Sequence, residues 1–138
     1  MERSACYQIA SITSMDEHLM ALHFFTDNPK QLLSEFNKRI DQDEPKGKIT
    51  TWIRDSDGDY THVAKDWGGK AWFRPKIIDG ALVFTILGRK KVTMPVVVYG
   101  YYHGHLTETF LNHFDTLFRT ASSSAQTAFG DSVGGSEA

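Results

Sequence analysis

The sequence predicts an α+β fold: a single domain in which an antiparallel sheet of about five to seven strands carries two amphipathic helices packed on one face. Two Asp-Gly pairs, Asp57-Gly58 and Asp79-Gly80, lie between β-rich runs, and this dipeptide favours the tight turns of β-hairpins. Two further segments repeat apolar residues at helical spacing, one before and one after the hairpins. Helices with a single apolar face pack on a sheet, so this order predicts a layered α+β domain.

The first predicted helix begins at Asn28-Pro29. Asparagine is a good capping residue, and proline suits the first helical position because its missing N–H would have no partner there. Helical spacing then produces one apolar stripe, formed by Leu32, Leu33, Phe36 and Ile40. The polar run 41–47 ends the helix.

The second predicted helix covers Leu106 to Phe118. Its apolar stripe consists of Leu106, Phe110, Phe114 and Leu117. Glu108 lies in the first turn, where a negative charge favours the helix dipole. The preceding segment, Lys91 to Tyr99, is predicted to be a strand, and Pro95 within it favours an edge position or a bulge.

The Asp79-Gly80 pair predicts a specific register. A two-residue turn aligns Ile78 with Ala81 and Phe73 with Ile86. One face of this hairpin is then apolar throughout, with Phe73, Pro75, Ile77, Leu82, Phe84 and Ile86. The other face carries Trp72, Arg74, Lys76, Ile78, Ala81, Val83, Thr85 and Leu87.

The stretch from Ser14 to Thr26 is ambiguous. Its first four residues, SMDE, have the form of a helical capping box. The alternation of Met20, Leu22 and Phe24 with other residues instead suits a strand that pairs with residues 7–12. We favour the strand because a hairpin leading into the Asn28 helix has the shorter connections.

The charge balance limits the classes of partner. The 138 residues have a formal net charge of −2, which does not favour a protein that grips nucleic acid through its phosphates. The segment from Lys65 to Lys91 has seven basic and two acidic residues. This segment is therefore where we expect an anionic partner to bind.

The remaining composition predicts a cytoplasmic protein. The single Cys6 cannot form an intramolecular disulfide, and the longest apolar stretch, Met94 to Tyr102, is shorter than the ~20 residues that span a bilayer. Residues 119–138 are mostly small and polar, so we expect the domain to comprise residues 1–118 and the rest to be a flexible tail.

A repeated aromatic-apolar-arginine pattern marks the predicted ligand-binding residues. It occurs as Trp52-Ile53-Arg54 and as Trp72-Phe73-Arg74. Alternation places each Trp and its Arg on one face, with Lys76 beside the second pair. Trp beside Arg suits a flat or anionic ligand. If these residues bind a partner, Arg54→Ala and Arg74→Ala should weaken binding and change stability by no more than roughly 0.5 kcal/mol, as expected for surface residues. The alternative is that the chain covers the tryptophans and water solvates the arginines.

The string Tyr101-Tyr102-His103-Gly104-His105 is a second candidate site. On an extended segment, His-x-His projects both imidazoles to one side, as in many metal-dependent hydrolases. A third ligand would come from His62, His113 or Asp115. If the helix begins near His103, the imidazoles diverge: His103 joins the apolar stripe and His105 points to solvent near Glu108.

We expect no bound metal and no cofactor. The residues Asp55 to Asp59 resemble a calcium loop, but Tyr60 occupies the position at which that loop has its glycine. A hairpin turn explains the same residues. The best interpretation is thus a non-enzymatic binding protein for an anionic or flat small molecule or an acidic protein, and the alternative is a metal-dependent or histidine-based hydrolase.

A homodimer is also expected. The sheet face opposite the helices would expose Trp72, Ile78, Val83 and Leu87. Contiguous exposed apolar area on a soluble protein usually marks an interface, and a two-fold dimer is the commonest solution.

Overall fold

The computed structural model describes residues 22–125, and they form an α+β fold with one antiparallel sheet. Along the chain the elements are β1 (Leu22–Phe25), α2 (Pro29–Asp41), β2 (Trp52–Arg54), β3 (Tyr60–His62), β4 (Ala71–Ile78), β5 (Ala81–Gly88), α3 (Val96–Phe114) and β6 (Thr120–Ser123). The six strands lie in the order β2-β3-β4-β5-β1-β6. The predicted fold class is therefore confirmed.

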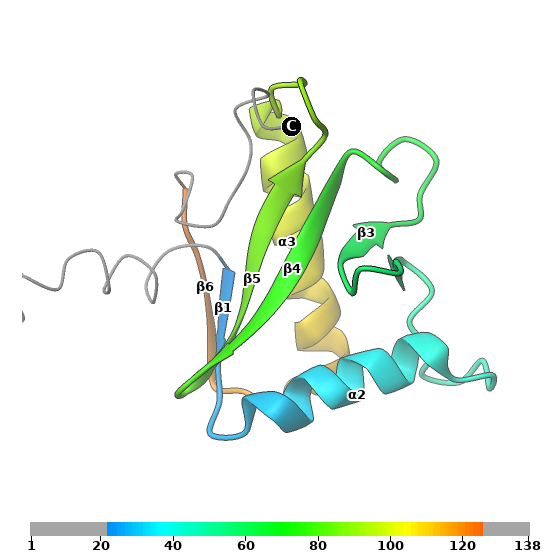
Figure 1. The fold of residues 1–138 in the computed structure, drawn as a ribbon. Coiled ribbons are helices and arrows are strands. Elements are labelled where there is room, and N and C mark those ends of the chain that lie inside the picture. The colour runs from blue at the N-terminus through cyan, green and yellow to red at the C-terminus, as the bar shows by residue number, and fades with distance from the viewer. Residues whose placement is uncertain (1–21, 126–138) are drawn as a thin grey trace, which may run out of the picture.

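The core lies between the sheet and the two helices. Helix α3 runs behind the sheet and α2 crosses its lower end (Figure 1). The rings of Phe36 on α2 and Phe110 on α3 lie 4.9 Å apart, and Phe24 of β1 stacks on Phe110 at 4.1 Å. Aromatic packing therefore joins both helices to the same strands.

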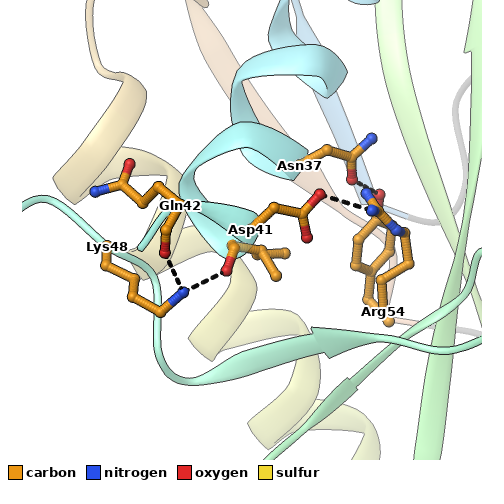
Figure 2. A network of polar contacts seen from close by, with 7 residues as sticks. Asn37, Asp41, Gln42, Lys48 and Arg54 are labelled. Carbon is orange, nitrogen blue, oxygen red and sulfur yellow. Dashed lines mark hydrogen bonds and ion pairs between the residues drawn. The ribbon is translucent and has the colours of Figure 1, made fainter. Parts of the chain in front are cut away.

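Helix α2 begins and ends where the sequence predicts. The Asn28 side chain accepts a hydrogen bond from the Gln31 N–H at 3.2 Å, as expected of a capping residue. At the other end, the Lys48 ammonium donates to the carbonyl oxygens of Ile40 and Gln42 at 2.7 and 2.6 Å (Figure 2). A positive charge at this end stabilises the helix dipole.

The predicted register of the second hairpin is confirmed from Ile78↔Ala81 to Phe73↔Ile86. Gly80 has a φ of 86°, which the tight turn requires and glycine adopts without strain. The apolar face of the hairpin is buried around Phe73 and Ile86. Toward the turn, Ile77 is 40% exposed, whereas its partner Leu82 stays buried.

The predicted strand from Lys91 to Tyr99 is wrong, because α3 already begins at Val96. Of the three consecutive valines 96–98, only Val98 is buried. Val98, Tyr102 and Leu106 are four residues apart and form one buried helical face. Pro95 precedes this helix as its cap.

The second predicted helix also ends elsewhere. Helix α3 stops at Phe114 instead of Phe118, and the Leu117 N–H closes a turn on the Phe114 carbonyl. This turn brings Phe118 back onto the core, where it is buried. The apolar pattern continues through this turn because the turn also packs on the core. The pattern alone therefore predicts a helix that is too long at its C-terminal end.

The sheet extends beyond the predicted domain end at Phe118. Thr120–Ser123 form β6, the edge strand beside β1. The Arg119 N–H donates to the Phe25 carbonyl at 2.8 Å and starts this pairing. The strand depends on backbone hydrogen bonds and needs no large apolar side chains, so composition alone assigned these residues to the tail.

Part of the ambiguous N-terminal stretch is a strand, since β1 covers Leu22–Phe25. It pairs with β5 on one side and with β6 on the other. The predicted partner strand at residues 7–12, and the tail from residue 126, lie outside the described residues.

Candidate functional site

The first predicted Trp/Arg pair faces the helices. Trp52 is buried and its indole N–H donates to the Thr109 hydroxyl of α3 at 3.0 Å. Arg54 forms an ion pair with Asp41 at the end of α2, at 2.8 Å (Figure 2). Both side chains thus hold the sheet to the helices.

The second pair lies on the opposite face. Tyr60 aligns with Arg54 on one side and with Phe73 on the other. Aligned residues share a face of the sheet, so Arg54 lies on the face of Phe73. Arg74 follows Phe73 along β4 and therefore lies on the opposite face. The structure therefore does not bring the two Trp/Arg pairs together. A joint binding face required a register between the hairpins that the sequence could not determine.

Arg74 has a partner within the chain. Its guanidinium binds both carboxylate oxygens of Asp59, at 3.0 and 2.8 Å, and this hydrogen bonding raises the pKa of Arg74. Asp59 is only 4% exposed. Trp72 is half-buried and Lys76 exposed on the same face of β4.

The sheet face proposed for dimerisation is already partly covered. Val83 is 1% exposed within the single chain and forms a small apolar cluster with Ala81, Phe25 and Ile78. Leu87 is half-buried. Part of this face is therefore shielded within the single chain, while Trp72, Ile78 and Leu87 remain partly exposed.

His103 points into the protein from α3. Its side chain is 3% exposed and stacks on the Tyr99 ring at 4.0 Å. Nδ1 lies 2.8 Å from the Tyr99 carbonyl oxygen, which can only accept, so Nδ1 carries the hydrogen. Burial lowers the pKa of His103. Nε2 is therefore an acceptor, and it has no partner among residues 22–125.

His62 and His105 form a hydrogen-bonded pair between β3 and α3. The Ala64 N–H donates to Nδ1 of His62 at 3.0 Å, so the hydrogen of neutral His62 is on Nε2. His62 Nε2 then donates to His105 Nδ1 at 2.6 Å. The remaining nitrogen of His105, Nε2, carries its hydrogen and faces Glu108 at 3.7 Å.

This arrangement bears on the predicted metal and hydrolase chemistry. His103 and His105 diverge because residues 96–114 are helical, as the alternative interpretation expected. A metal on His62 Nε2 would require a hydrogen on Nδ1, where the Ala64 N–H already points. His105 presents a donor to solvent, whereas a general base must present a lone pair.

The candidate third ligands do not complete such a site. In the part of the chain that the structure describes, the one group of three metal-ligating side chains is Asp55, Asp57 and Asp59. Asp55 accepts hydrogen bonds from the N–H groups of Asp57 and Asp59 at 2.9 and 3.0 Å. These bonds shape the loop between β2 and β3, as expected for a hairpin turn.

Acid should destabilise the protein through His62. Burial, followed by the influence of His105, lowers its pKa to about 4. As the pH falls below about 6.5, the unfolded chain takes up a proton at His62 and the folded chain does not, until about pH 4. The stability that neutral His62 contributes is therefore complete above pH 6.5 and is lost as the pH falls toward 4.

The variant His62→Asn tests this origin. Its side-chain oxygen can still accept from the Ala64 N–H but does not titrate. We expect the slope of unfolding free energy against pH between 6.5 and 4 to decrease by up to about 1.4 kcal/mol per pH unit in urea denaturation series. An unchanged slope would assign the acid sensitivity to His103 and His113, whose pKa values burial also lowers.

A groove of about 510 Å³ lies between α3 and β6. Apart from the imidazole of His103, its walls are apolar or hydroxyl-bearing: Val96, Tyr99, Gly100, Gly104, Thr107, Ser123, Ser124 and Ala125. None of these side chains carries a formal charge at neutral pH, because His103 is neutral. The groove is thus suited to an uncharged ligand.

Two features hide this groove in the sequence. The composition around Ser123 and Ser124 is typical of a polar tail, and the helix that carries His103 begins earlier than its apolar pattern predicts. Gly100 and Gly104 are the one sequence signal at this place. Both lie in helix α3, where glycine is unfavourable unless the structure requires it.

Comparison with known proteins finds no matching family model, no matching curated protein and no matching solved structure. Within residues 22–125, neither helix is long and apolar enough to cross a membrane.

Proposed function

We propose that the protein binds a small, neutral, mainly apolar molecule in the groove between α3 and β6. Ligand sites typically measure about 300–1,000 Å³ and combine apolar walls with a few polar groups. The groove has this size and this lining. A binding role also agrees with the hydrogen bonds of His62 and His105, which oppose metal ligation and general-base catalysis.

The observation that carries the proposal is the Nε2 of His103, which has no hydrogen-bond partner among residues 22–125. A buried acceptor without a partner costs about 1–3 kcal/mol, and this one belongs to a residue of the groove wall. A ligand with a hydroxyl or amide N–H would supply the missing donor. Nε2 is buried, so the imidazole must turn toward the groove when such a ligand binds.

Phenol and anisole are suitable probes, since they have similar shapes and only phenol can donate. We expect both to shift the NMR signals of Thr107 and Ser123, and phenol to bind about 2- to 10-fold more tightly because of one added hydrogen bond. In His103→Phe, which retains an aromatic ring but lacks the acceptor, this preference should vanish.

Two results would reject the proposed site. One is a titration in which neither probe shifts the groove residues. The other is a phenol preference that persists in His103→Phe, because the donor would then bind elsewhere. We place this binding role in the cytoplasm, because the sequence has a single cysteine, Cys6, and so cannot form an intramolecular disulfide.

A further inference from the structure

The outer face of α3 is unusually apolar for a helix surface. Val97 and Leu111 are 64% and 53% exposed, and Gly100 and Gly104 between them are exposed too. Together with half-exposed Thr107, these residues alternate at spacings of three and four. We call this set the outer stripe: Val97, Gly100, Gly104, Thr107 and Leu111. Such spacing is typical of a seam between two helices.

Charge and glycine content support an interface here. Glu108 is the one residue of α3 with a formal charge, whereas the outer face of a surface helix is ordinarily charged. Each helical glycine costs about 1 kcal/mol relative to alanine. A Cβ at Gly100 or Gly104 would meet nothing within 4 Å, so packing within the described chain does not require them. Small residues on a helix allow a second backbone to approach closely.

The outer stripe complements a second copy of itself. When two antiparallel helices cross at Gly104, residues equally far before and after it face each other across the two-fold axis. Val97 then meets Leu111 of the other copy, and Glu108 meets Gly100. In a parallel pair, Glu108 would face Glu108, and like charges opposite each other repel.

We propose that two copies of the chain pair through the outer stripe, with their α3 helices antiparallel around a two-fold axis at Gly104. The stripe spans about 14 residues, or about 21 Å of helix. One helix pair of this length covers less than a standard stable interface. The dimer is therefore weak and forms as the protein concentration rises.

This proposal does not rest on the groove ligand, but the two surfaces overlap: Gly100, Gly104 and Thr107 of the outer stripe also line the groove. Pairing and ligand binding therefore compete for this face of α3. Val97 and Leu111 do not line the groove, so variants at these positions test pairing in the absence of ligand without altering the groove walls. Both side chains are exposed in the single chain, and charged substitutions there leave its core intact.

The test is sedimentation equilibrium of four proteins: wild type, Val97→Lys, Leu111→Glu and the double variant. Each single variant places a charge against an apolar side chain, twice in every dimer, and we expect pairing to weaken by about tenfold or more. In the double variant, the introduced ammonium of one copy faces the introduced carboxylate of the other, again twice in every dimer. Its pairing should return close to the wild-type level.

Ile53→Lys is the matched control, because Ile53 is also exposed but lies on edge strand β2. Its pairing should equal that of the wild type, and backbone NMR spectra should show that all variants are folded. A double variant that pairs no better than the single ones would overturn the antiparallel geometry. A wild type that stays monomeric at millimolar concentration would overturn self-pairing and leave the stripe to a different protein.

Discussion

Phe84→Ala should lower the free energy of unfolding by about 3–5 kcal/mol, the largest effect we expect of a single substitution. Phe84 is completely buried on β5. Its ring lies about 6 Å from those of Phe24, Phe36, Tyr60, Phe73 and Phe110. These residues come from three other strands and both helices, so the cavity left by truncation cannot close by moving one element.

Urea denaturation measures this loss, with Ile77→Ala as the matched control. Ile77 belongs to the same hairpin face but is 40% exposed, and its truncation should cost about 1 kcal/mol or less. A Phe84→Ala loss similar to that of the control would mean that the core can repack around the missing ring.

Local signals predicted the elements whose causes are local. The Asp79-Gly80 turn fixes its hairpin register because two residues decide which partners align. Likewise, Asn28 and Pro29 determine where α2 starts without reference to the rest of the chain. In both places the apolar pattern and the turn or cap agree, which leaves one solution.

Helix α3 shows where local signals fail. Val96 and Val97 have high strand propensity, and the two glycines lower helix propensity, yet the segment is helical. Burial decides the outcome, because only a helix places Val98, Tyr102 and Leu106 together on the core. Tertiary packing thus overrides an unfavourable local sequence.

The candidate site depends even more on long-range structure. The groove forms because β6 pairs with β1, about a hundred residues earlier in the chain. The partners of His62 and of Arg74 also lie on other elements. The sequence could identify histidine and arginine as candidates, but it could not determine which groups satisfy them.

The sequence predicts the same small stability change for both Arg→Ala variants, but in the structure the two arginines should behave differently. Arg54→Ala removes an ion pair with a carboxylate of Asp41 that is itself largely exposed, and exposed pairs contribute about 0–1 kcal/mol. Arg74→Ala leaves the buried carboxylate of Asp59 without its bidentate partner. We expect this to cost about 1.5–3 kcal/mol, toward the lower end because water reaches half of Arg74.

A double-mutant cycle separates the energy of the Arg74–Asp59 contact from the cost of leaving the Asp59 carboxylate charged and without a partner. Asp59→Asn combined with Arg74→Ala removes the buried charge together with its partner. The double variant should therefore be more stable than Arg74→Ala alone, with a coupling energy of roughly 0.5–3 kcal/mol between the two positions. The same cycle at Arg54 and Asp41, with Asp41→Asn, should give a coupling of at most about 1 kcal/mol. Equal couplings at both pairs would show that Asp59 reaches water in solution, and Arg74 would again be a candidate for binding an anionic partner.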